Sequence, residues 1–181
     1  ADASEPTVAT PIGAYTAMLP EWALVRDLMG GTRTMRAAGE VRLPKFPKES
    51  PQAYEIRRQS AILFNAFRHT VSSLVGRVFS EPITFSEDTD PRVLEWAKDI
   101  DLTGRDITAY GRDCLTDMIA FGISHTTPEM TNVEARREQL GRQNTAADDQ
   151  VFKIRPYLAK VHPLSLIGWR GGDEALLELA R

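Results

Sequence analysis

The sequence has little of the side-chain chemistry that redox, metal and nucleophilic sites use. It contains one cysteine, Cys114, and three histidines among 181 residues. A single cysteine excludes an intrachain disulfide and fits a reducing compartment. His69, His125 and His162 lie far apart and have no metal-ligand spacing to one another or to Cys114. We therefore predict no metal site and interpret these four residues as core or surface side chains.

Other signatures are missing as well. No apolar run approaches the roughly 18 residues of a membrane span, and residues 1–15 show no secretory signal. No G-x-S-x-G elbow occurs, and "GGTRT" lacks the Lys-Ser/Thr pair of a phosphate-binding loop. The sequence thus indicates no catalytic residue and no cofactor, and we expect a protein that is not an enzyme.

The composition is that of a chain able to bury a core. Hydrophobic residues make up 42% and charged residues 26%, which is usual for globular proteins. The formal net charge is -3, so no overall positive field attracts the chain to DNA or to anionic lipid.

The first half of the chain predicts helices. After an extended arm over residues 1–15, Leu19-Pro20 is expected to open a helix that Gly30-Gly31 ends. Its apolar stripe comprises Trp22, Val25, Leu28 and Met29. A single long helix is predicted over residues 50–79, with Ser50 as N-cap and Pro51 in the first turn. Its wide apolar face comprises Ile56, Leu63, Phe64, Phe67, Val71, Leu74, Val75 and Val78.

Two further helices and a short strand follow. "ITF" at 83–85 is a candidate strand, and Asp90-Pro91 is typical of the start of a short helix. Thr103 is the expected N-cap of the next helix, and Leu102 is expected to pack on Ile107. Gly122 is expected to end this helix. The expected buried stripe of that helix comprises Ile107, Tyr110, Cys114, Met118 and Phe121.

The last third of the chain contains both helical and extended patterns. Thr131 with Glu134 predicts a capped polar helix, "ISHT" and "FKIRPYLAKV" read as extended segments, and "DEALLELAR" has helical spacing. The predicted fold class is mainly α with a small β element (α+β). We expect an arm (1–15), a helical domain (16–170) and a terminal helix (171–181), after which the chain is expected to continue in a longer protein.

Two groups of acidic residues are candidates for a calcium-binding or an acid–base site. "EDTDP" (Glu87, Asp88, Asp90) lacks the spacing of a calcium-binding loop, so a solvated turn that caps a helix is the better interpretation. Asp148 and Asp149 are adjacent in a loop with nothing apolar beside them to raise a pKa.

Residues 33–50, "RTMRAAGEVRLPKFPKES", hold five cations and two anions. The stretch could be a nucleic-acid arm, a hinge, or a surface loop pinned between helices. Glu40 and Glu49 interrupt the positive run, and Phe46 alone is aromatic, so no base-stacking series exists. We favour protein contact over DNA contact. The candidate contact residues are Arg36, Arg42, Lys45 and, on the first helix, Trp22.

Several segments together resemble a known family. They are Leu43-Pro44, Asn65-Ala66, Val75-Gly76-Arg77-Val78-Phe79, Ala120-Phe121-Gly122 and Arg155-Pro156-Tyr157-Leu158. Their order over roughly residues 15–170 resembles the N-terminal, wing-type portion of tailed-bacteriophage portal (head-tail connector) proteins. Family members are longer, with a downstream stem and clip, and usually carry a longer apolar strand where this chain has "ISHTTPEM".

The resemblance implies a structural role. Portal subunits form a ring, commonly a dodecamer, at one capsid vertex, through which double-stranded DNA is packaged and ejected. It implies as partners other copies of the chain, the major capsid protein, terminase, head-tail adaptor proteins and DNA, with no membrane. The location would be the virion, and the host cytoplasm during assembly. The alternative is a cellular helical adaptor without a catalytic role. An enzyme fragment whose site lies beyond Arg181 is a further alternative.

Overall fold

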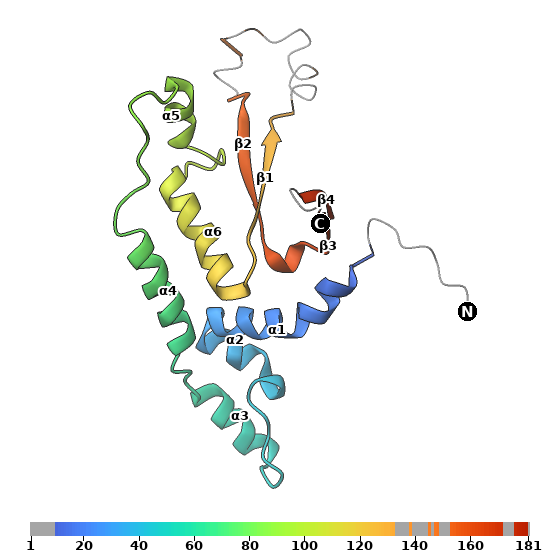
Figure 1. Ribbon diagram of the computed structural model, residues 1–181. Helices are drawn as coiled ribbons and strands as arrows, with labels where there is room; N and C mark the ends of the chain where they lie inside the picture. The colour runs from blue at the N-terminus through green and yellow to red at the C-terminus, as the bar shows by residue number, and fades with distance from the viewer. Residues whose placement is uncertain are drawn as a thin grey trace, which may run out of the picture.

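The chain is mainly helical with two small antiparallel sheets, which confirms the predicted fold class (Figure 1). The computed structural model describes residues 10–132, 138, 145, 147–148, 153–171 and 176–180. The helices are α1 (Gly13–Gly30), α2 (Thr32–Ala37), η1 (Gly39–Val41), α3 (Pro51–Ser60), α4 (Ala66–Val78), α5 (Pro91–Ala97), α6 (Ile107–Phe121) and η2 (Pro163–Ser165). The strands are β1 (His125–Met130), β2 (Pro156–Val161), β3 (Gly168–Gly171) and β4 (Leu176–Ala180).

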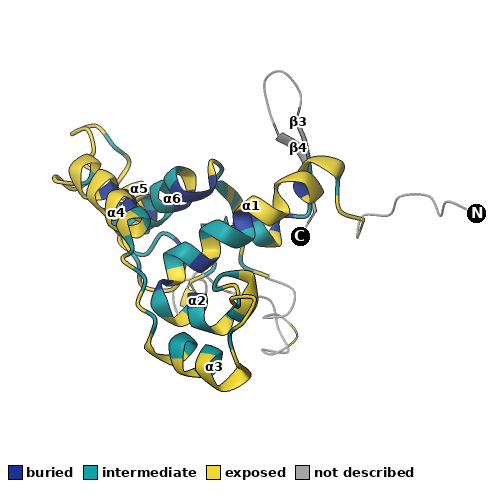
Figure 2. Cartoon of the chain, turned by 90° about the horizontal axis from the view of Figure 1, so that it is seen from below, coloured by how far each residue is buried: buried dark blue, intermediate teal, exposed yellow. Residues whose placement is uncertain are grey.

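The core forms where α1 crosses α4 and α6 (Figures 1 and 2). Its buried members are Tyr15, Trp22, Val71, Val75, Ala120 and Phe121. The Trp22 indole donates a hydrogen bond to the Phe121 carbonyl at 3.0 Å, and the Tyr15 hydroxyl donates to the Leu164 carbonyl at 2.9 Å. Burial of each large side chain contributes about 1.5–3 kcal/mol, so this crossing holds the helical elements together.

Helix α1 begins earlier than the sequence indicates. Pro20 lies inside it, although proline lacks the N–H that an interior helical residue donates. Tertiary contacts of the first turns outweigh that cost: Tyr15 packs edge-on against Trp22, and the Ile12 amide donates to the Ile167 carbonyl. Residues 13–15 are therefore helical rather than part of an extended arm. The predicted end is confirmed, since Gly31 follows the helix with φ 72°.

The single helix predicted over 50–79 is wrong. Ser50 caps α3 as expected, but the chain is irregular over 61–65 before α4 begins. Asn65 ends the interruption, because its side chain accepts a hydrogen bond from the Arg68 amide and caps α4. The freed backbone groups find tertiary partners: Arg36 donates to the Ala61 carbonyl, and the Leu63 amide donates to the Thr32 hydroxyl. Apolar periodicity alone does not reveal such partners.

Helix α5 starts as predicted, with Asp90 accepting a hydrogen bond from the Arg92 amide. The cap of α6 is Asp106, which accepts from the Ala109 amide, and not Thr103. Thr103 instead donates to the buried Asp101 carboxylate in the loop before the helix. Because Asp106 is the cap, Leu102, at φ 63°, does not hold the position directly before the cap that a hydrophobic staple uses.

The expected buried stripe of α6 is partly wrong. Tyr110 and Phe121 are buried, and Gly122 ends the helix in the left-handed region as predicted. Ile107 and Cys114 are half-buried. Met118 is 51% exposed; it faces away from α1 and α4, whose packing selects a neighbouring face of α6.

Strands β1 and β2 form an antiparallel hairpin in which His125 pairs with Val161 and Met130 with Pro156. The sequence predicted extended chain over residues 123–126, which include the first two residues of β1, and over 152–161, which include all of β2. Strand β3 pairs with β4, so the predicted helix over 171–181 is wrong for residues 176–180, where pairing with β3 outweighs helical spacing. "ITF" at 83–85 forms no strand. The polar helix expected after Thr131 lies almost wholly outside the described residues.

Candidate functional site: a folded basic segment and an exposed apolar surface

The basic segment, residues 33–50, is pinned to the rest of the chain through its arginines. The Arg42 guanidinium donates to the Asp27 carboxylate of α1 at 2.8 Å. Arg36 donates to the Ala61 carbonyl at 2.8 Å, and Arg58 of α3 donates to the Arg36 carbonyl at 2.8 Å. Two of the predicted contact residues, Arg36 and Arg42, are therefore occupied inside the chain.

Asp27 holds Arg42 and so attaches the basic segment to α1, and sequence reasoning missed it. Its side chain is 11% exposed and also accepts from Arg26. Burial raises its pKa, but the hydrogen bonds and charges of Arg42 and Arg26 outweigh that effect, so the pKa is lowered from its usual value. The signal in the sequence was an acidic residue placed near the end of an otherwise apolar helix stripe.

A second attachment closes the segment against α3. Arg57 forms a bidentate pair with Glu49 at 2.7 and 2.8 Å and also donates to the Pro44 carbonyl. The hydrogen bond from Arg57 is the main reason that the pKa of Glu49 is lowered to about 2. The guanidinium lies 4.4 Å from the Phe46 ring centroid. The segment is thus a folded surface loop between α2 and α3.

The predicted contact residue Trp22 lies in the core of its own chain. It is 3% exposed, and its indole nitrogen is already bonded to Phe121. It is therefore not available to a partner. Lys45 is half-exposed and forms no ion pair among the described residues, so it alone of the four predicted residues stays open for contact.

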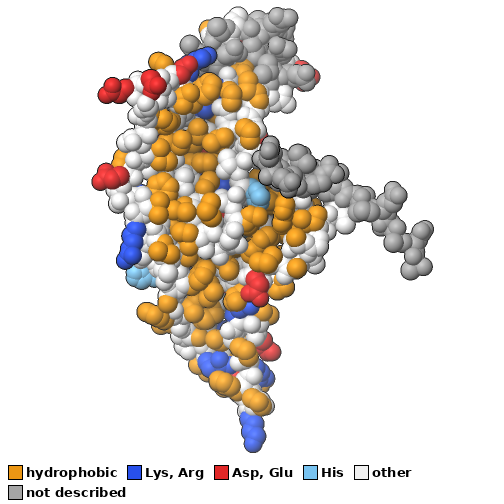
Figure 3. Space-filling model, in the orientation of Figure 1, with side chains coloured by type: hydrophobic (Ala, Val, Ile, Leu, Met, Phe, Trp, Pro, Cys, Tyr) orange, Lys and Arg blue, Asp and Glu red, His pale blue; other side chains and the backbone are white. Residues whose placement is uncertain are grey.

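Large hydrophobic side chains are more often exposed than buried in the part of the chain that the structure describes. Hydrophobic side chains cover much of the face shown in Figure 3, along the length of the molecule. Of the exposed ones, Leu74 and Val78 lie on α4 and Met118 on α6. The exposed set is Met18, Leu19, Val41, Phe46, Ile56, Ile62, Phe64, Leu74, Val78, Ile83, Phe85, Val93, Leu94, Met118 and Met130, against eleven buried hydrophobic residues. Scattered exposed apolar residues are normal, but contiguous ones mark interaction surfaces.

The most exposed members lie in the interruption between α3 and α4. Ile62 is 82% exposed and Phe64 90%, while the alternating Ala61, Leu63 and Asn65 face the fold. Sequence reasoning assigned Phe64 to a buried helix face. The alternating pattern of an extended segment was the signal that could have identified this exposure.

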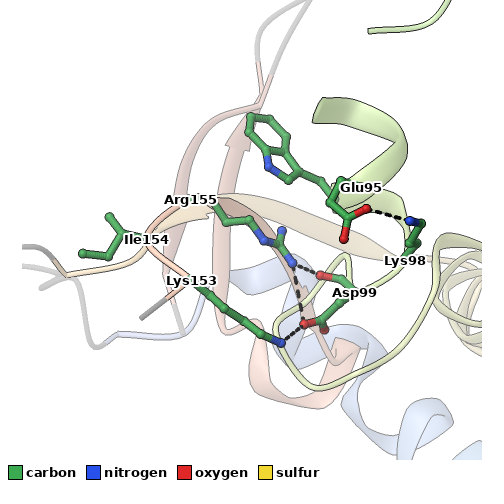
Figure 4. A pocket seen from close by; sticks show the side chains of 7 residues that line it. Glu95, Lys98, Asp99, Lys153, Ile154 and Arg155 are labelled. Atoms are coloured by element: carbon green, nitrogen blue, oxygen red, sulfur yellow. Dashed lines mark hydrogen bonds and ion pairs between the residues drawn. The ribbon is translucent and has the colours of Figure 1, made fainter. Parts of the chain in front are cut away.

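A cavity of about 510 Å³ lies beside α5 and the start of β2 (Figure 4). Asp99 accepts hydrogen bonds from Lys153 and Arg155, and Lys98 pairs with Glu95. The Lys153 hydrogen bond is the leading cause of the lowered pKa of Asp99. Every charged group that lines this cavity is thus paired with another, which suits a structural ion-pair network that ties the loop after α5 to β2.

The histidines, Cys114 and the acidic turn occupy structural positions. His125 and His162 have pKa values lowered by burial, and the His162 ring packs edge-on against Phe121. His69 is exposed beside Ser73, at 3.3 Å, and Cys114 lies 3.7 Å from the Thr126 hydroxyl. In the acidic turn, Asp90 caps α5 as predicted.

Asp117 is a second buried carboxylate that the sequence did not reveal. It is 7% exposed and lies 2.9 Å from the Lys160 ammonium, so the pair ties α6 to the hairpin. Within the described residues no group of three His, Cys, Asp or Glu side chains could hold a metal ion. None of the described helices is long and apolar enough to cross a membrane.

No known family model matches the chain, and a search of curated proteins finds no significant sequence relative. The functional interpretation therefore rests on the molecular surface, where exposed apolar side chains lie on ordered elements beside a folded basic segment.

Proposed function

We propose that the chain is a structural subunit that assembles into a portal-like ring at a phage capsid vertex and has no catalytic role. The observation that carries the proposal is the exposed apolar surface, in which large hydrophobic side chains stay uncovered on ordered elements from α3 to α5. Burial of such side chains drives association much as it drives folding. A second copy of the same chain is the partner that the proposal names first.

The segments that resemble portal proteins are the reason that the proposal names a portal ring rather than another assembly. A ring at the vertex would let double-stranded DNA pass during packaging and ejection. The further partners of the proposal are the major capsid protein, terminase and head-tail adaptor proteins, and its location is the virion after assembly in the host cytoplasm.

The proposal is tested by mass in solution and by electron microscopy. We expect light scattering at micromolar concentration to report an oligomer, and negatively stained particles to show rings with a central hole. A monodisperse monomer would overturn the proposal.

Matched variants show whether the apolar surface causes the assembly. Ile62→Ser with Phe64→Ser should reduce the oligomer while leaving the thermal midpoint near that of the unmodified chain, because both side chains are almost fully exposed. Val71→Ser, at a 3% exposed core position, serves as the control that lowers the midpoint by destabilising the fold.

A further inference from the structure

One end of the molecule carries cations without an ion pair in the described part of the chain, although the charge of Lys45 contributes to the lowered pKa of Glu49, a carboxylate that Arg57 already pairs. Arg33 and Lys48 are exposed, Lys45 is half-exposed, and none of the three has an ion pair within the described residues. Glu40 is the exposed anion among them. We call Arg33, Lys45 and Lys48, with the exposed apolar residues Val41, Phe46 and Ile56 of the same stretch of chain (33–56), the basic tip.

The opposite end carries the complementary charge. Between α4 and α5, Glu81 and Glu87 are exposed and form no ion pair among the described residues. The Ser86 hydroxyl donates to Asp88, whose carboxylate also has no ion pair there. Residues 80–96 are exposed almost throughout, although they are ordered. We call Glu81, Glu87 and Asp88, with the exposed Ile83, Phe85, Val93 and Leu94, the acidic arm.

The two surfaces cannot neutralise each other within one chain. Figure 1 shows α3, beside the basic tip, at one end of the molecule and α5, beside the acidic arm, at the other. We propose that the basic tip of one copy docks on the acidic arm of the next copy. This inference rests on the proposed function and specifies its subunit contact: two different surfaces make a head-to-tail interface, which closes into a ring when the rotation permits.

A second copy fits the basic tip better than nucleic acid does. The same stretch of chain exposes three large apolar side chains, and phosphate recognition has no use for them. Docked together, the two surfaces bring opposite charges and exposed apolar side chains into one contact, as protein interfaces do. On this proposal, Arg36 and Arg42 hold the basic segment on its own chain, and Lys45 and Lys48 contact the neighbouring copy.

Charge reversal tests the pairing. Lys45→Glu with Lys48→Glu reverses the tip, and Glu81→Lys with Glu87→Lys reverses the arm. We expect each reversed chain alone to lose the oligomer, with self-association weakened by about tenfold or more because like charges then face each other. An equimolar mixture of the two reversed chains should assemble again, since every contact in an alternating ring becomes complementary.

A control and three outcomes make the test decisive. Glu21→Lys, at an exposed anion of α1 without an ion pair among the described residues, should leave assembly unchanged. If the unmodified chain never self-associates, the proposed function fails. If it forms rings that neither reversal affects, or that the mixture does not restore, the pairing fails while the proposed function stands. If tip reversal lowers the salt slope of duplex DNA binding and spares assembly, the tip is a nucleic-acid arm and the pairing is overturned.

Discussion

The attachment of the basic segment to α1 gives a quantitative prediction at Arg42. Arg42→Met keeps most of the aliphatic stem and removes the guanidinium that lies 2.8 Å from Asp27. Removal of one partner from a fully buried ion pair costs about 3–5 kcal/mol, whereas an exposed pair contributes about 0–1 kcal/mol. Asp27 is 11% and Arg42 22% exposed, and Arg26 still contacts the carboxylate. We therefore expect the free energy of unfolding to fall by about 2 kcal/mol.

A double-mutant cycle separates the ion pair from other effects. Asp27→Asn removes the charge with little change of shape, and the combined Asp27→Asn, Arg42→Met chain should lose less stability than the sum of the single changes. Urea unfolding followed by circular dichroism measures all four chains. A loss below about 0.5 kcal/mol for Arg42→Met, which is within the range of ordinary surface substitutions, would refute the view that this pair pins the segment.

Acid titration gives the same pair an independent signature. The pKa of Asp27 is lower in the folded chain than its ordinary value of 3.8, so its ionised form is stabilised by folding. That contribution is complete above the unfolded pKa and is lost as the pH falls through the folded pKa. In Arg42→Met the pKa of Asp27 should rise toward its unfolded value, so the part of the acid-induced loss of stability that this carboxylate causes should be smaller than in the unmodified chain.

Three other predictions address α6 and the hairpin. Met118→Ala should cost less than about 1 kcal/mol because the side chain is half-exposed, whereas Phe121→Ala should cost about 3–5 kcal/mol in urea unfolding. Asp106→Ala should cost about 1 kcal/mol through loss of the cap, and an unchanged midpoint would contradict the cap. Burial lowers the pKa of His125, so the unfolded state binds the proton more readily and stability should fall as the pH drops below about 6.5. His125→Gln should flatten that decline, and the exposed His69→Gln should not.

Local signals in the sequence predicted the elements whose causes are local. Ser50, Asp90 and Gly122 lie where the capping rules place them, and β2 follows its extended pattern. The errors have tertiary causes. Pro20 was read as a helix start because its cost is local, while the contacts of Tyr15 that outweigh it come from residues about 150 positions away.

The candidate site was only partly visible for the same reason. The sequence located the basic segment and favoured protein contact, but periodicity could not show that Arg36 and Arg42 find acceptors at Ala61 and Asp27. The apolar face of residues 50–79 was expected to be buried as one helix. Because the chain breaks at 61–65, only part of that face meets α1 and α6, and Phe64 turns outward.

The division of labour between arginine and lysine in the basic segment follows from their chemistry. A planar guanidinium holds several acceptors in a fixed geometry, and Arg36, Arg42 and Arg57 each use it to fasten the segment to its own chain. Lysine is a compact charge on a flexible stem, which suits a contact that forms only when another molecule arrives. Alanine at Arg36 or Arg42 would therefore lower assembly through loss of the fold, whereas reversal at Lys45 and Lys48 isolates the contact itself. Only the lysine variants can distinguish a subunit interface from a structural loop.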